Sequence, residues 1–157
     1  MPAPNARFEM SHAVIRLEDY WPYQVTVLAD IISRRTAAVV REHGDLNLSQ
    51  WRVLAAIAER PGRTAVDVVA MTPMDKGIVS RATKVLLETG LLVRRASQSD
   101  GRVSHLFLTE KGATLYQTLR GHVEAVQEPA DAVLSPAEQA AFCTVLKRLA
   151  RALPDSD

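Results

Sequence analysis

Apolar residues recur with the period of an α-helix along most of this sequence. A long first stretch begins near residue 20 or 22 and runs to about residue 43. Three shorter stretches follow Asn47, Thr64 and Thr72, and two more run from about 110 to 126 and from 136 to about 153. Short polar or glycine-containing turns separate them. The pattern predicts a mainly helical chain.

Four of these helices begin with a residue that can cap a helix and a second polar residue three positions later. The pairs are Asn47–Gln50, Thr64–Asp67, Thr72–Asp75 and Ser135–Glu138. Pro73 and Pro136 then occupy first helical positions, and Thr109 caps the helix that Glu110 opens. Gly44 and Gly90 are expected to end the helices that precede them.

Two short stretches instead favour strands. Residues 91–95 and residues 103–108 are rich in apolar and β-branched residues, and Ser97–Gly101 between them is typical of a turn. We therefore expect a hairpin directly after the helix that starts at Thr72. Three arginines, Arg94, Arg95 and Arg102, lie in or beside it. The fold class predicted is mainly α with a small β wing (α+β), as in winged helix proteins.

The helix before the hairpin separates its residues into two faces at 100° per residue. One face is apolar or small: Val79, Ala82, Thr83 and Leu86. The opposite face is cationic and hydroxylated: Lys76, Gly77, Ser80, Arg81 and Lys84. Small residues beside donors suit a helix that enters the major groove of DNA. The alternative is the solvated surface of an ordinary amphipathic helix.

Charge favours the DNA interpretation locally but not globally. The whole chain of 157 residues carries a net charge of +1. Residues 72–104 contain six Lys or Arg and three Asp or Glu, and six minus three gives +3. The positive charge is thus concentrated on the predicted helix and hairpin.

Composition narrows the class of protein further. Hydrophobic residues make up 47% of the chain and charged residues 24%, as in soluble globular proteins. The sequence holds no apolar run long enough to span a membrane and no visible secretory signal, so a cytoplasmic location is expected. It also lacks the spacings of common catalytic, metal-binding and cofactor motifs. We therefore predict no enzyme activity, no metal and no cofactor.

The order of several short motifs resembles the MarR (multiple antibiotic resistance regulator) family of transcriptional regulators. They are Asn47–Trp51, Met74–Lys76, Val79–Arg81, Gly90–Leu92, Asp100–Arg102 and Leu108–Gly112. The resemblance covers roughly residues 15–153. It implies a homodimer in which the first helix and the last two helices intertwine with those of a second subunit. It also implies that Asp100 shapes the wing rather than contacting DNA.

The resemblance divides the chain, a single MarR-like domain over 1–157, into regions. Residues 12–44 and 109–157 are predicted dimerisation helices, and 45–108 form the winged helix region. Within it, Ser80, Arg81 and Lys84 are predicted to enter the major groove, with Arg81 reading a base. Thr64 and Lys76 are predicted to contact phosphates. The hairpin arginines Arg94, Arg95 and Arg102 complete the predicted DNA-binding set, with Arg102 directed to the minor groove or its phosphates.

Many members of the family hold a small aromatic carboxylate in a pocket between the first helix and the DNA-binding domain. In this chain an arginine, Arg16, and a histidine, His12, precede an aromatic group of Tyr20, Trp21 and Tyr23. Arginine can clamp a carboxylate through two hydrogen bonds. We predict an effector site from His12, Arg16, Tyr23 and Trp51. The alternative is that the aromatic residues only pack in the core and at the subunit interface.

The single cysteine, Cys143, lies on the apolar side of the last predicted helix. A buried structural thiol is favoured over a redox role there. The sequence as a whole predicts a homodimeric, DNA-binding transcriptional repressor that a small ligand releases from a near-palindromic operator. The alternative is a winged helix module for protein–protein contact or dimerisation that does not bind DNA.

Overall fold

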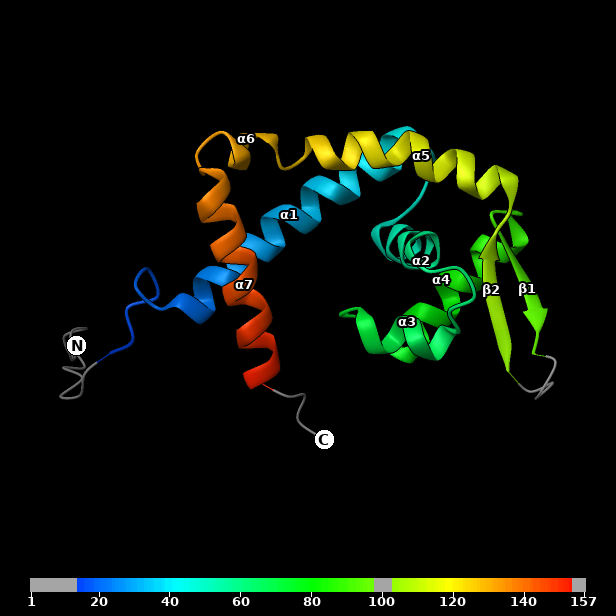
Figure 1. Cartoon of the computed structure of the whole chain (residues 1–157), viewed down its shortest axis with the longest axis horizontal. Helices are drawn as coiled ribbons and strands as arrows, with labels where there is room; N and C mark the ends of the chain where they lie inside the picture. The colour runs from blue at the N-terminus through cyan, green and yellow to red at the C-terminus, as the bar shows by residue number, and fades with distance from the viewer. Residues whose placement is uncertain (1–13, 98–102, 154–157) are drawn as a thin grey trace, which may run out of the picture.

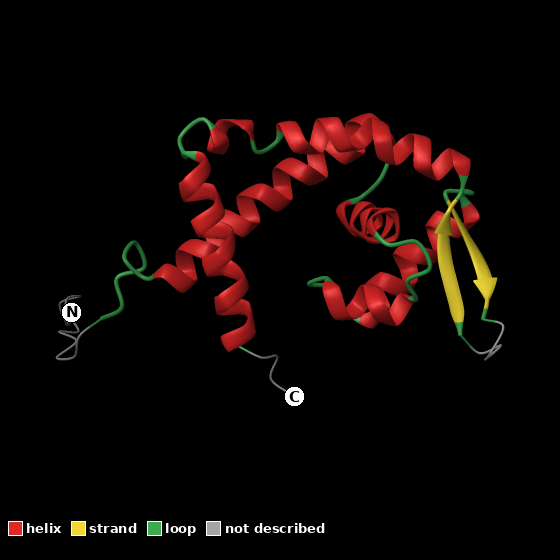
Figure 2. Ribbon diagram, in the orientation of Figure 1, coloured by secondary structure: helices red, strands yellow, loops and turns green. Residues whose placement is uncertain are grey.

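A computed structural model of the chain describes residues 14–97 and 103–153 (Figure 1). It contains the helices α1 (Trp21–Gly44), α2 (Leu48–Glu59), α3 (Ala65–Met71), α4 (Lys76–Glu88), α5 (Glu110–Ala125), α6 (Glu128–Asp131) and α7 (Pro136–Ala152). The strands β1 (Leu92–Ala96) and β2 (Ser104–Leu108) form one antiparallel hairpin. Figure 2 shows that most of the described chain is helical and that the two strands form a small antiparallel sheet. The predicted fold class, mainly α with a small β wing, is therefore confirmed.

Three capping boxes open helices where the sequence predicts them. The side chains of Asn47, Thr64 and Ser135 each accept a hydrogen bond from the backbone N–H three residues later, and that residue's side chain accepts one in return. Each reciprocal pair satisfies two donors that a helix start otherwise leaves free. These caps therefore fix the starts of α2, α3 and α7.

The predicted start of α4 at Thr72 is wrong by about three residues. Thr72 instead ends α3, where its hydroxyl donates to the Val68 carbonyl oxygen at 2.7 Å. Asp75 is the N-cap of α4 and accepts from the Ile78 backbone N–H at 2.7 Å. The turn between the helices places Met74 in the core at 6% exposure. Burial of this apolar side chain accounts for the longer turn.

The C-terminal end of α1 also differs from expectation. Gly44 remains helical, and Asp45 adopts the left-handed conformation at φ 51°. A side chain at Gly44 would bring Cβ to 2.7 Å from Leu119 of α5, so a glycine lets the two helices cross closely. Gly90, at φ +70°, takes the left-handed position predicted for it.

Helix α6 is an element that the sequence does not predict. Pro129 follows shortly after the end of α5 at Ala125, as expected, and lies in the first turn of α6, where a proline costs no hydrogen bond. The strands agree with prediction to within one residue at each end. The one-residue differences lie at the ends of the strands, where short-range sequence signals are weakest.

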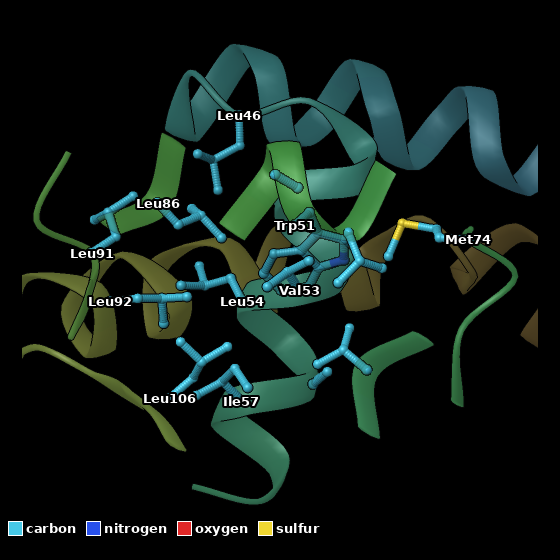
Figure 3. Packing of buried hydrophobic residues seen from close by; sticks show 14 of the residues in the cluster. Leu46, Trp51, Val53, Leu54, Ile57, Met74, Leu86, Leu91, Leu92 and Leu106 are labelled. Atoms are coloured by element: carbon cyan, nitrogen blue, oxygen red, sulfur yellow. The ribbon is translucent and has the colours of Figure 1, made fainter. Parts of the chain in front are cut away.

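The buried core lies almost wholly in the middle of the chain (Figure 3). It joins α2, α3 and α4 to the hairpin, the end of α1 and the middle of α5. Its members are Val40, Leu46, Trp51, Val53, Leu54, Ala56, Ile57, Val68, Met74, Val79, Ala82, Leu86, Leu91, Leu92, Leu106 and Leu119. The apolar face predicted for α4 is part of this core, and Thr83 on the same face is also buried. The core holds α4 rigidly with its opposite face outward.

The first half of α1 and the whole of α7 stand outside this core. Figure 1 shows them with α6 on the side away from α2–α4 and the hairpin. Only Thr36 and Val40 are buried in α1, and α7 has no buried residue. Large apolar side chains on them are exposed: Trp21, Tyr23, Val25, Val27, Leu28, Ile31, Ile32, Phe142 and Val145. So many exposed large apolar side chains on two helices are unusual for a soluble monomer.

Candidate nucleic-acid interface

The outward face of α4 carries the side chains that the sequence assigns to DNA. Lys76, Ser80, Arg81 and Lys84 are all exposed, whereas the face behind them is buried. Gly77 lies between them and leaves room for Arg81: a Cβ at Gly77 would be 3.3 Å from Arg81 Nη1. The face is therefore flat around a central glycine, with cationic side chains around it.

Most cations of this face are not neutralised by acids. Lys84 lies 3.8 Å from Glu88, and both side chains are largely exposed, so this pair is weak. Within residues 14–97 and 103–153, neither Lys76 nor Arg81 forms an ion pair. Both remain available to phosphate or base acceptors.

The hairpin brings two arginines to different sides. The register pairs Arg94 with Leu106 and Arg95 with His105. Because side chains alternate along a strand, Arg94 shares the helix-facing side with buried Leu92. Arg95 projects from the other side, where its guanidinium carbon lies 4.8 Å from the centre of the Phe107 ring. Arg94 is thus the hairpin arginine that joins the α4 face.

A hollow of about 280 Å³ lies where α3, α4 and β1 meet. Lys76, Ser80, Thr83 and Arg94 supply its polar lining; Ala65, Val66, Val69 and Val79 supply the apolar part. The Thr83 hydroxyl is buried and has no hydrogen-bond partner in the described part of the chain. The face of α4 therefore continues into a concave edge that bears two cations.

The turn between α2 and α3 anchors the hairpin through hydrogen bonds that the sequence does not predict. The Gly62 N–H donates to the Leu106 carbonyl at 2.8 Å, and the Leu106 N–H donates to the Arg63 carbonyl at 3.0 Å. His105 Nδ1 lies 2.7 Å from the Gly62 carbonyl oxygen. Since a carbonyl can only accept, Nδ1 carries the hydrogen. In the sequence, Pro61–Gly62 predicts only the end of a helix. The hydrogen bonds between this turn and β2 join residues far apart in the chain, so no local pattern predicts them.

Among the described residues that the sequence predicts to bind DNA, Thr64 has a geometry that argues against this role. Its N–H and its hydroxyl both donate to Asp67 Oδ2, at 2.7 and 2.9 Å. These two hydrogen bonds hold the pKa of Asp67 below its usual value. A threonine whose donors serve a carboxylate has none free for a phosphate, so we leave Thr64 out of the proposed interface.

The structure separates the aromatic residues that the sequence groups with an effector. Trp51 is buried and stacks on Tyr116 of α5, with ring centres 5.6 Å apart. Tyr23 is exposed near the start of α1, away from α2 in the same chain. Arg16 pairs with Glu18 and Asp19 and is 70% exposed. One chain alone therefore does not assemble Tyr23 and Trp51 into one pocket.

Two predicted site residues, His12 and Arg102, lie outside the described residues, as does Asp100. Cys143 is exposed rather than buried in the single chain, because its helix packs on little else. Residues 14–97 and 103–153 contain no group of three or more His, Cys, Asp or Glu side chains that could hold a metal ion. No helix among them is long and apolar enough to cross a membrane.

A helix-turn-helix followed by an anchored hairpin, with the second helix exposed and basic, defines a winged helix-turn-helix protein. Residues 44–103 match the model of the MarR family. This match bears out the resemblance to the MarR family of transcriptional regulators that the motifs predict.

Curated relatives are similar to this chain in sequence, and solved structures share its fold. The transcriptional regulator PetP of Rhodobacter capsulatus is 27% identical over 110 residues, which are 70% of this chain and 66% of PetP, slightly under two thirds of its length. A MarR-family regulator from Silicibacter pomeroyi has the same fold, with TM-score 0.81, 22% identity and coverage of 93% of this chain and 99% of that one.

Two further structures with this fold were solved as complexes. Staphylococcus aureus MepR, in complex with DNA, has TM-score 0.74 and 18% identity over 85% of this chain and 98% of its own. The PcaV regulator from Streptomyces coelicolor, in complex with its natural ligand, has TM-score 0.73 and 23% identity over 90% and 99% of the two chains.

Proposed function

We propose that this chain is a homodimeric, cytoplasmic repressor that binds a near-palindromic operator and is released by a small ligand. The observation that carries the proposal is the two-sided helix α4. Its apolar side is locked in the core, while Lys76, Ser80, Arg81 and Lys84 are presented to solvent. An outward helix of this kind, beside a basic hairpin, fits the major groove of DNA.

Different residues of the interface have different tasks in this proposal. Arg81 reads a base edge, since it has no acidic partner and lies over Gly77. Ser80 and Lys84 enter the groove beside it. Lys76 and Arg94, around the hollow between α3, α4 and β1, contact phosphates. Arg95 and Arg102 extend the contact from the hairpin. The DNA complex of MepR supports a DNA-facing use of this fold.

The dimer follows from the exposed apolar surfaces of α1 and α7. Two chains that pair these surfaces would remove them from water, which the core of one chain does not. A two-fold dimer presents two copies of α4, so the operator should hold two half-sites about one helical turn apart. The regions 12–44 and 109–157 are thus proposed as dimerisation segments around the winged helix region 45–108.

Salt dependence tests DNA binding by this face. For the wild type, log affinity should fall linearly with log salt because bound phosphates release counterions. Lys76→Ala should make the slope shallower by about one unit per subunit. Lys147→Ala, which removes an exposed lysine of α7, is the matched control and should leave the slope unchanged. A protein that binds duplex DNA with no salt dependence, or not at all, favours the protein–protein module instead.

The ligand is proposed to be a small aromatic carboxylate held near the start of α1. Arg16 lies there beside exposed Tyr20, Trp21 and Tyr23, and it already holds the carboxylates of Glu18 and Asp19. A ligand carboxylate would replace these exposed partners, which bind weakly. Trp51 could join the site only from the partner subunit. The PcaV regulator, which has this fold, was solved in complex with its natural ligand, and this supports a ligand-binding role for the fold.

An aromatic carboxylate that acts in this way should raise the melting temperature and weaken operator binding, because it favours one dimer geometry over another. Arg16→Ala should lose both effects and keep its DNA affinity. Thermal melts and operator titrations across a panel of aromatic acids measure this. If no acid in the panel shifts the melt of the wild type, the α1 site should be abandoned.

A further inference from the structure

A second cavity lies on the other side of α4 from the hollow described above. Its volume is about 880 Å³, within the range of small-molecule sites. It opens between the end of α1, the start of α2, the last turns of α4 and the first turns of α5. The exposed apolar surfaces of α1 and α7 proposed for the dimer do not line it. It is also separate from Arg16 and the α1 effector site.

Two close crossings frame this cavity. At one, α1 meets α5 through Gly44, where an added Cβ would lie 2.7 Å from Leu119. At the other, α5 meets the entrance to β1 through Gly112, where an added Cβ would lie 2.0 Å from the Leu91 carbonyl oxygen. The Leu119 side chain lies against the glycine at the first point and the Leu91 backbone at the second, so the elements that frame the cavity are already in contact there. The cavity is part of the packing of the fold.

The walls of the cavity are apolar with acceptors exposed among them. Leu46, Val85, Leu91 and Leu115 supply the apolar surface. The three threonine hydroxyls of the lining, of Thr89, Thr114 and Thr118, all donate to carbonyls of their own helices. Their remaining lone pairs can only accept. A ligand in this space would meet an apolar wall, these acceptor oxygens and the side-chain amide of Gln50.

The charged side chains at the cavity, like its acceptor oxygens, favour a ligand that donates hydrogen bonds and carries positive charge. Asp45 and Glu110 form no ion pair within residues 14–97 and 103–153, and both belong to the lining. The opposing cation, Lys111, already donates from Nζ to the Thr89 carbonyl at 2.9 Å. Two free carboxylates against one occupied ammonium attract a cation and repel an anion. The C-terminal ends of α1 and α4 and the N-terminal ends of α2 and α5 all meet at this cavity, so their helix dipoles offset one another and the charged side chains set the preference.

We infer that this cavity binds an amphipathic organic cation, with an aromatic or alicyclic body against the leucine and valine side chains and an ammonium group at Asp45 or Glu110. The bound molecule would press on the last turns of α4 and on its exit into β1, through Val85, Thr89 and Leu91. It would therefore change the position of α4 relative to α1 and α5. Only this consequence for DNA rests on the proposed function.

Three molecules with one ring system test the charge preference by calorimetry on the full-length protein without DNA. They are 1-naphthylmethylammonium, 1-naphthalenemethanol and 1-naphthoate. The ammonium should bind about two- to fivefold more tightly than the alcohol, the gain expected for exposed charge pairs. The carboxylate should bind this cavity more weakly than either. Equal affinity of ammonium and alcohol would overturn the inference.

Two sets of variants assign the binding to this cavity. Asp45→Asn with Glu110→Gln should remove the advantage of the ammonium, and asparagine still suits the left-handed backbone at position 45. Glu124→Gln with Asp131→Asn removes two exposed carboxylates elsewhere and should change nothing. Thr114→Trp should fill the cavity and abolish binding, whereas Gln117→Trp, exposed on the same helix but outside the lining, should not.

Either set can overturn the inference. If the charge variant or Thr114→Trp binds the ammonium as the wild type does, the cation lies elsewhere. Carboxylate binding that survives both variants belongs to the α1 site instead. Where DNA binding itself is observed, saturating ammonium should shift operator affinity, and operator should shift ammonium affinity by the same factor. Unchanged operator affinity would refute the regulatory role of the cavity.

Discussion

Removal of residues 136–157 is expected to leave protein that is insoluble or unfolded. In the single chain α7 buries none of its residues, and the first half of α1 exposes Leu28, Ile31 and Ile32. In the proposed dimer these surfaces cover each other, so deleting α7 exposes the partner's α1 as well. For the intact protein, the unfolding midpoint should rise with protein concentration, because folding and association are coupled.

The matched control is removal of residues 154–157 alone, which leaves α7 complete and should preserve the dimer. Sedimentation and thermal unfolding at several protein concentrations provide the measurement. A soluble, well-folded monomer from the larger truncation would contradict the role of α7. An unfolding midpoint independent of concentration in the intact protein would contradict an obligate dimer.

Arg81→Ala is expected to weaken operator binding by about 1–3 kcal/mol per lost base contact and to relax preference at one base pair in each half-site. The side chain is exposed and lies over Gly77, so the variant should fold like the wild type. Arg120→Ala, which removes an exposed arginine of α5, is the control. Binding to operator and scrambled duplexes measures both affinity and discrimination.

The hairpin should behave differently from α4. Arg102→Ala should weaken operator and scrambled duplexes more evenly and make the salt slope shallower by about one or two units per dimer. If Arg81→Ala instead weakens both duplexes equally while Arg102→Ala erases discrimination, the two arginines have exchanged roles.

The face of α4 could be predicted from sequence because a packed helix repeats its burial every few residues. Val79, Ala82, Thr83 and Leu86 are buried as the 100° spacing predicts, and Lys76, Ser80 and Arg81 are exposed opposite them. The start of α4 could not be predicted in the same way. Thr72 and Asp75 are both good caps, and only the burial of Met74 between them decides for Asp75.

Other features depend on contacts between residues far apart in sequence. Arg94 and Arg95 are adjacent and chemically identical, and the strand register alone directs one toward α4 and the other over Phe107. The hydrogen bond from His105 to Gly62 spans 43 residues. The sequence predicts one effector site for Trp51 and Tyr23, but within one chain Trp51 stacks on Tyr116 in the core. The composition of the sequence and the spacing of its motifs do not predict which distant residues will be in contact.

The most direct test of the central claim is to sequence the DNA that the purified protein retains from its own genome. The proposed function predicts a few enriched fragments that share a near-palindrome, with half-sites about one helical turn apart. The same experiment with Arg81→Ala should enrich the same fragments less and with weaker preference within each half-site. Retention of no DNA, or of fragments without a shared sequence, would contradict a sequence-specific regulator that reads DNA with α4.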